Sequence, residues 1–253
     1  MDMALDDERQ QDNQPSSSGE HPGSGLHFGV ARSLQDVLDA WMLVGTAHAR
    51  AGVPGAEHGA VSTVPEAIGP QSLVAMGWIG QLAVSTVTGI VDGPQGLPLG
   101  RVFAGEIDGL RRPGRRLMEL TLFADRRALV TRSFSAILEL IRHMYHFAHR
   151  EEVTDVLIGL PPRVARFYVQ YFSFGRSLAP GAVRMLDGQA VELLYLDLAA
   201  RARLNPPPKE QAYFVENPVA EAIFAARYPF PMEEIACSVL ARHLPRQLHR
   251  QPA

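Results

Sequence analysis

The chain has 253 residues, of which 46% are hydrophobic, and this is enough to bury one full core rather than to form a disordered or fibrous protein. Its formal net charge of −3 gives no general attraction to nucleic acid or to an anionic membrane, and no basic helix or aromatic platform supports a nucleic-acid role. The single cysteine, Cys237, excludes an intrachain disulfide and a zinc site built from cysteines, so we expect a cytoplasmic protein.

The two ends of the chain differ in composition from its middle. Residues 1–25 are acidic and rich in Ser, Gly and Gln, lack the basic start and apolar core of a signal peptide, and predict a disordered tail. No run approaches the roughly 20 apolar residues that span a bilayer, so no transmembrane segment is expected. Residues 26–200 predict one mixed α/β domain, and residues 201–253, with a helix near 232–244, predict a C-terminal helical extension.

Hydrophobic periodicity and turn signals predict how strands and helices alternate in the middle of the chain. Ser33 and Asp36 have the spacing of a capping box at the start of an amphipathic helix. Asp187-Gly188 is the strongest short hairpin signal. Helices that cross between strands on either side of an antiparallel hairpin predict a mixed sheet flanked by helices. We expect strands at 26–31, 72–76, 81–91, 116–125, 154–160, 182–186 and 189–198, helices at 33–52, 101–112, 134–148 and 161–172, and a loop at 52–70.

The strand RLMELTLFAD, residues 116–125, carries a carboxylate in an apolar row. The period of a strand predicts that Leu117, Glu119, Thr121 and Phe123 share one face. Apolar neighbours on that face raise the pKa of a carboxyl toward neutrality by desolvation, which suits a general base. A structural carboxylate, bonded to backbone groups or to an arginine of the run RRPGRR, is the alternative for Glu119.

A succession of motifs in residues 85–125 and 155–175 resembles one family. A strand ends in an Asp-containing turn and is followed by the step GLP, the acidic helix EIDGLR and then GRRLME, which enters the next strand. This order is similar to that of the GNAT-fold N-acyl amino acid synthases of the FeeM type, which are related to the acyl-homoserine lactone synthases. The resemblance covers roughly residues 28–198, and the whole succession is more specific than any one motif.

The resemblance implies a GNAT-fold N-acyltransferase that moves a long-chain fatty acyl group to the amine of an amino acid or a similar small amine. The usual GNAT diphosphate loop is missing, because ADRRALVTRS has no glycine after the central strand. This fits a family in which acyl carrier protein delivers the acyl group. The resemblance therefore implies acyl-phosphopantetheine, or alternatively acyl-CoA, as co-substrate, and no tightly bound cofactor. The turn VDGPQGLPLG and the helix after it would form a lid and docking surface beside the site.

The resemblance also suggests roles for individual residues. Glu119 would be the general base, and Tyr168, on the helix after the fifth strand, would donate a proton to the departing thiolate, with Tyr171 as its competitor. The acyl donor and substrate are expected to contact Trp41, Phe103, Thr121, Phe123 and Phe134, with Trp78 as a further wall of an apolar tunnel. An acidic carrier protein would dock on Arg111, Arg112, Arg115, Arg116, Arg126 and Arg127, with Arg132 nearby.

Structural interpretations of the same residues remain as alternatives to the proposed roles. The aromatic residues also fit an ordinary core, and the arginines also fit a solvated helix end and loop. The arginine that relatives carry shortly after the central glutamate is absent, which weakens a homoserine lactone synthase. A GNAT-like acyl-binding or regulatory protein without turnover is the alternative to the enzyme, since fold alone does not fix function.

Overall fold

The structure is a computed structural model that describes residues 25–126, 134–176, 183–204 and 208–230. The expected N-terminal tail, the helix near 232–244 with Cys237, and both Arg127 and Arg132 lie outside the described residues. Within the described part, no helix is long and apolar enough to cross a membrane.

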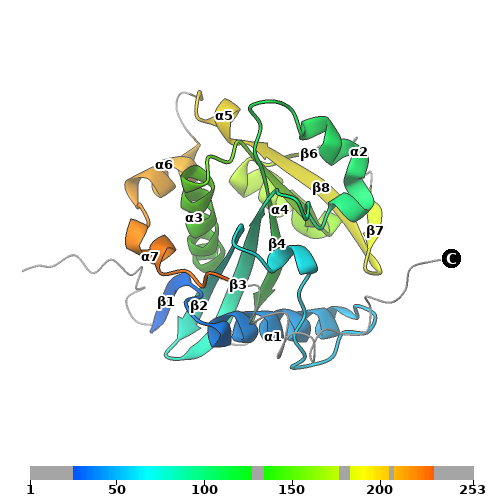
Figure 1. The fold of residues 1–253 in the computed structure, drawn as a ribbon, viewed down its shortest axis with the longest axis vertical. Helices are drawn as coiled ribbons and strands as arrows, with labels where there is room; N and C mark the ends of the chain where they lie inside the picture. The colour runs from blue at the N-terminus through cyan, green and yellow to red at the C-terminus, as the bar shows by residue number, and fades with distance from the viewer. Residues whose placement is uncertain (1–24, 127–133, 177–182, 205–207, 231–253) are drawn as a thin grey trace, which may run out of the picture.

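The described residues form one mixed sheet of eight strands (Figure 1). Its order is β1-β2-β3-β4-β5-β8-β6, with β7 paired to the side of β8. Among these pairs β4 and β5 run parallel and their neighbours run antiparallel, as the sequence predicts for a mixed sheet. The strands are β1 (Leu26–Val30), β2 (Ser72–Ile79), β3 (Leu82–Val91), β4 (Leu117–Asp125), β5 (Asp155–Leu160), β6 (Gly175–Arg176), β7 (Arg184–Leu186) and β8 (Gln189–Asp197).

Helices cover both faces of this sheet. One face carries α1, α2 and a short 3-10 turn, η1, while α3, α4, α6 and α7 pack on the other. Figure 1 shows α1 and α3 on opposite sides of the central strands. The helical elements are α1 (Leu34–Ala51), η1 (Pro65–Ala67), α2 (Gly100–Leu110), α3 (Phe134–Arg150), α4 (Pro162–Phe172), α5 (Leu198–Arg201), α6 (Lys209–Glu216) and α7 (Glu221–Ala225).

Local signals explain where several elements begin and turn. The Ser33 hydroxyl accepts the Asp36 N–H at 3.1 Å and the Asp36 carboxylate accepts the Ser33 N–H at 3.1 Å, which is the predicted capping box of α1. Asp187 and Gly188 both have positive φ, 47° and 75°, as a two-residue hairpin turn between β7 and β8 requires. The strand β6 is two residues long and was not expected from the sequence.

A bulge in β4 decides which side chains face which layer. Leu122 has φ of 53°, and the register between β3 and β4 shifts between the pairs Thr86–Ala124 and Thr88–Thr121. The extra residue reverses the alternation, so Phe123 lies on the α3 and α4 side, where its ring contacts Tyr168. The predicted common face of Glu119 and Phe123 is therefore wrong, because simple alternation cannot include a bulge.

The chain after α7 crosses the β1 edge of the sheet. Phe224 of α7 belongs to the core on the α3 side. The Tyr228 N–H then donates to the Ala31 carbonyl at 2.8 Å, and the Phe230 ring stacks on Trp41 of α1 at 6.1 Å between centroids. The described C-terminal segment thus contributes to the cores on both faces.

Candidate active site

Glu119 lies in the middle of β4, the strand at the centre of the sheet. Its side chain is on the α1 and α2 side, and the residue is 2% exposed. Its neighbours across the sheet are Ile90 of β3 and Leu157 of β5, which are fully buried. One carboxylate oxygen accepts the Leu99 N–H at 2.8 Å, just before α2 begins.

Burial changes the acidity of this carboxyl group. Desolvation raises the pKa of Glu119 from 4.5 to about 8, and the Leu99 hydrogen bond opposes part of that shift. The charges of Glu66 and Asp92 raise the pKa further, while that of Arg101 lowers it. A carboxyl group with a pKa near neutrality can take up and release a proton at physiological pH, as a general base must.

The turn that follows β3 supplies the hydrogen bond to Glu119. The turn places Leu99 so that its N–H meets the carboxylate and its side chain lies over β5. An ideal Cβ built on Gly159 would lie 2.5 Å from the tip of the Leu99 side chain, so only a glycine leaves room for this approach. The turn is thus part of the site and not only a connection between β3 and α2.

Two ion pairs hold the same turn at its ends. The Arg101 guanidinium, in the first turn of α2, donates to both carboxylate oxygens of Glu66 at 2.9 and 2.6 Å. The Arg111 guanidinium, just after α2, donates to both oxygens of Asp92 at 2.7 and 3.0 Å and also to Asp108 at 2.7 Å. Sequence reasoning missed Glu66 and Asp92, whose partners are 35 and 19 residues away along the chain.

The two parallel central strands pair over only part of their length. Their pairing runs from Leu117 and Asp155 to Leu120 and Ile158. Beyond that point β4 continues to Asp125 beside β3, whereas β5 continues to Leu160 beside β8. The two central strands therefore have different partners beyond Leu120, the residue that follows Glu119.

Tyr168 lies on the other face of the sheet from Glu119. It is 4% exposed, and its ring contacts Phe123 of β4 edge-on at 6.0 Å. Desolvation raises the pKa of its phenol, so the hydroxyl keeps its proton at neutral pH. Its competitor Tyr171 is 45% exposed on the outer side of α4, where it contacts Phe134 and Phe167.

A comparison with models of protein families shows which family the chain belongs to. The model of the N-acyl amino acid synthase FeeM matches residues 39–197, which is more than half of the protein. The chain belongs to the FeeM family. It is accordingly an N-acyltransferase, as the order of motifs in the sequence predicts. No curated protein sequence matches the chain significantly.

Solved structures agree with this assignment at the level of the fold. FeeM itself, an N-acyl amino acid synthase from uncultured soil microbes, has a TM-score of 0.59 and 19% identity, covering 69% of this chain and 92% of FeeM. The CoA-dependent acyl-homoserine lactone synthase BjaI has a TM-score of 0.51 and 12% identity, covering 79% of this chain and 98% of BjaI. The predicted GNAT fold, a mixed sheet flanked by helices, is confirmed.

The residues that the FeeM resemblance suggested for the acyl donor are not all in one place. Trp41 and Phe103 are fully buried on the Glu119 side, where Trp41 is covered by Phe230 and the Phe103 ring lies under the Arg184 guanidinium. Phe134 lies at the start of α3 and is 42% exposed. Two further residues complete the placement: Thr121, half-buried beside Glu119 on β4, and Trp78 of β2, whose ring stacks on His27.

An apolar cavity lies on the α3 side of the sheet, where sequence reasoning did not place one. Its walls come from β4, α3, the end of α4 and the segment of α5 and α6. Met118 and Leu120, the neighbours of Glu119 in β4, line it from the sheet. The ion pair between Arg201 and Glu210 lies at its edge. None of the five residues expected to contact the acyl donor lines this cavity.

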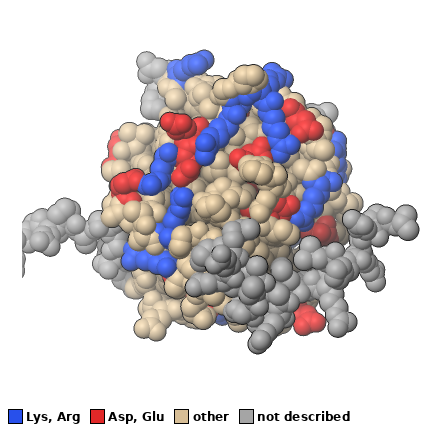
Figure 2. All heavy atoms as spheres, in the orientation of Figure 1, with Lys and Arg blue, Asp and Glu red and all other residues tan. Residues whose placement is uncertain are grey.

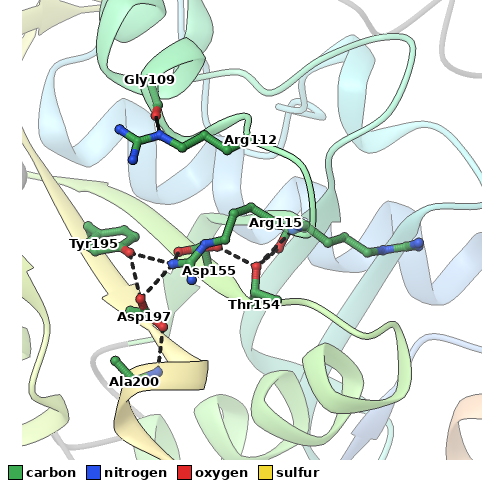
Figure 3. Close-up of polar contacts among 9 residues, drawn as sticks. Gly109, Arg112, Arg115, Thr154, Asp155, Tyr195, Asp197 and Ala200 are labelled. Atoms are coloured by element: carbon green, nitrogen blue, oxygen red, sulfur yellow. Dashed lines mark hydrogen bonds and ion pairs between the residues drawn. The ribbon is translucent and has the colours of Figure 1, made fainter.

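The predicted docking arginines are mostly engaged within the protein. Figure 3 shows Arg115 reaching between the start of β5 and the end of β8, where it bonds to buried Asp155, to Tyr195 at 2.9 Å and to Asp197 at 2.7 Å. These contacts join three strand ends that are 40 and 82 residues apart in sequence. Arg115 therefore holds the sheet together at the base of β4.

The other described arginines of this set differ in the number of contacts that they make within the protein. Arg111 is held by Asp92 and Asp108, Arg116 approaches Glu151 at 3.5 Å, and Arg126 donates to the Ala83 carbonyl at 2.9 Å. Arg112 donates to the Gly109 carbonyl at 2.7 Å and is otherwise exposed. Figure 2 shows acidic and basic side chains interspersed over the visible face, so the arginines do not form a continuous basic surface there.

Proposed function

We propose that the protein transfers a long-chain fatty acyl group from the phosphopantetheine of acyl carrier protein to the α-amine of an amino acid, giving an N-acyl amino acid. The FeeM family supports N-acyl transfer, and the small cavity beside the central strands has an apolar lining that suits part of a fatty chain. The observation that carries the proposal is Glu119, a buried carboxylate with a pKa near 8 at the centre of the sheet.

Glu119 is the general base of the proposed reaction. The α-amine of a free amino acid titrates at about 8 to 9, so most of it is ammonium at neutral pH and must lose a proton before it can attack. A base with a pKa of about 8 is matched to that proton. The amine nitrogen then bonds to the thioester carbonyl carbon, the carbon–sulfur bond breaks, and the thiolate takes up a proton.

The donor reaches Glu119 from the α4 side in this proposal. Beyond Leu120 the strands β4 and β5 are no longer paired, so the phosphopantetheine arm lies between them and its thioester approaches the carboxylate. Tyr168 contacts β4 at Phe123, just past that point, and remains the proposed proton donor to the thiolate. Its protonated hydroxyl supports this role.

The fatty chain enters the apolar cavity on the α3 side, which has a volume of about 30 Å³ and must widen to hold the whole chain. Met118 and Leu120 line that cavity, and they flank Glu119 in β4 while facing the opposite layer. The β4 residues on either side of Glu119 thus line an apolar space on the opposite face of the sheet. This placement differs from the tunnel between Trp41, Trp78, Phe103 and Phe134 that the sequence suggested, which stays a prediction.

We also propose that the protein is cytoplasmic and that an acidic carrier protein docks on its arginines, as the resemblance and the composition suggest. Because Arg111 and Arg115 are held by internal carboxylates, the steering charge would come chiefly from Arg112, Arg116 and Arg126. Acyl-CoA, the donor named for BjaI, is the alternative donor. A parallel assay with acyl carrier protein and acyl-CoA as donors decides between them.

Mass spectrometry of lipid extracts tests the reaction. Cells that express the wild-type protein should accumulate N-acyl amino acids that cells with an empty vector lack, and the product mass identifies the acceptor. A Glu119→Gln variant should lose them, whereas Glu57→Gln, a change at an exposed glutamate, should keep them. Lipid profiles that match the empty vector, from a folded protein that retains acyl chains, would instead indicate a binding protein.

A further inference from the structure

An ion pair next to Glu119 has hydrogen-bonding capacity that the fold does not use. Glu66 of η1 and Arg101 of α2 form an ion pair beside the turn whose Leu99 N–H binds Glu119, and their side chains are 12% and 42% exposed. A single nitrogen of Arg101, Nη2, makes both contacts with Glu66. Its Nε and Nη1 have no acceptor among the residues that the structure describes.

The comparison with Arg111 shows why this matters. Arg111 uses Nε, Nη1 and Nη2 together, on Asp92 and Asp108, and ties the end of β3 to the end of α2. A guanidinium carries five N–H donors, so Arg101 is anchored by one nitrogen and keeps three donors for a ligand. Arg111 therefore has a structural role. Arg101 is fixed by Glu66 but still has N–H groups that can bind a ligand.

Arg101 is also close enough to Glu119 to affect its titration. Its positive charge lowers the pKa of Glu119, and the charge of Glu66 raises it. Arg101 follows Leu99 by two residues, and the Leu99 N–H is the group that binds the Glu119 carboxylate. A ligand that approaches Glu119 along this turn therefore lies near the Arg101 guanidinium.

We infer that Arg101 binds the carboxylate of the acceptor amino acid and that Glu66 holds the guanidinium in position for it. An α-amino acid carries its amine and its carboxylate on one carbon, so a cation beside a general base matches both groups at once. The carboxylate anchored on Arg101 directs the amine toward Glu119, and a charge-assisted hydrogen bond fixes that orientation. This inference rests on the proposed N-acyl transfer and assigns Arg101 as the residue that positions the acceptor.

A competition assay tests the inference separately from the proposed function. Purified protein and acyl donor are given an equimolar mixture of the twenty standard amino acids and their carboxamides, which keep the amine but lack the negative charge. The ratio of acid to amide products, read by mass spectrometry, reports relative kcat/KM. We expect Arg101→Gln to lower this ratio at least tenfold, because it removes charge-assisted hydrogen bonds to the carboxylate.

Two further variants make the result specific. Arg50→Gln, at an exposed arginine in the last turn of α1, should keep the wild-type ratio. Arg101→Lys, which preserves the charge opposite Glu66, should lower the ratio less than Arg101→Gln and serves if the glutamine variant does not fold. An unchanged ratio in an active Arg101→Gln variant would overturn the inference, and no N-acyl product from wild-type protein with either acceptor would overturn the proposed function itself.

Discussion

Glu119 is the residue on which the interpretation depends, and its burial has a cost that can be measured. Its pKa in the folded protein is about 8, above the ordinary value of 4.5, so the folded state binds the proton more tightly than the unfolded chain does. The contribution of Glu119 to stability is therefore complete below about pH 4.5 and is lost as the pH rises through 8. A general base placed in an apolar layer destabilises the fold at the pH at which it works.

Replacing Glu119 by glutamine should remove this pH dependence. Gln keeps an oxygen for the Leu99 N–H but cannot ionise, so the variant should gain stability over wild type between pH 5 and pH 8, by an amount on the order of a few kcal/mol at pH 9. The measurement is the free energy of unfolding in urea at several pH values. A difference between variant and wild type that is independent of pH would mean that folding does not raise the pKa of Glu119.

At the scale of single elements, α1 depends on a close approach to the loop that follows it. A Cβ at Gly45 would lie 1.9 Å from the Ala60 carbonyl oxygen, which belongs to the backbone and cannot rotate away. Trp41, one turn earlier, accepts the Ser62 N–H at 3.0 Å with its carbonyl, so loop and helix are tied here. Gly45 is therefore a packing position rather than a flexible one.

Gly45→Ala and Gly105→Ala form a matched pair for this contact. Gly105 in α2 has open space around an added Cβ, so alanine there should stabilise by up to about 1 kcal/mol through helix propensity. The same change at Gly45 should destabilise by about 1–3 kcal/mol, because the backbone must move apart. The Tm of each variant, measured by thermal unfolding, tests these opposite effects. Equal shifts of Tm would contradict the packing argument.

The elements that sequence patterns predict well are those fixed by neighbouring residues. Ser33 with Asp36, and Asp187 with Gly188, each act within four residues and are found as predicted. The bulge at Leu122 is set by pairing with β3 and by the separation from β5, so the direction of Phe123 could not be predicted. The burial of Glu119 could be predicted from alternation, but its hydrogen bond to Leu99 spans 20 residues and could not.

At the scale of the whole molecule, the described C-terminal segment is tied to the sheet through a buried polar cluster on α3. The Glu139 carboxylate, 3% exposed, accepts from Arg142 and from the Tyr213 hydroxyl of α6 at 2.6 Å. Arg142 in turn donates to the Asn217 carbonyl at 2.8 Å. These contacts hold α6 against α3, next to the apolar cavity that we assign to the fatty chain.

Tyr213→Phe tests this attachment. The change leaves one oxygen of a buried carboxylate without its hydroxyl partner and should lower the free energy of unfolding by about 1–3 kcal/mol. Tyr171→Phe, at an exposed ring on α4, should change it by less than about 0.5 kcal/mol. Equal effects of the two variants in urea unfolding would show that α6 is not held through Glu139.

Charge composition alone does not predict which arginines are held by contacts within the protein. The run RRPGRR is the densest basic stretch of the sequence, yet its Arg115 forms ion pairs with Asp155 and Asp197 from distant strands. Pairing across 40 and 82 residues is a property of the folded sheet and has no local signal. The same holds for Arg101 and Glu66, where the sequence shows neither the ion pair nor its place beside Glu119.

The rate of acyl transfer by purified protein tests the central claim most directly. With an acyl donor and amino acids at pH 8, Glu119→Gln should lower kcat/KM by about 100-fold or more, the usual contribution of a general base, while Glu57→Gln should not. The wild-type rate should rise as the pH increases toward 8, where Glu119 becomes ionised. A folded Glu119→Gln variant with the wild-type rate and the same pH profile would contradict the assignment of Glu119 as the base.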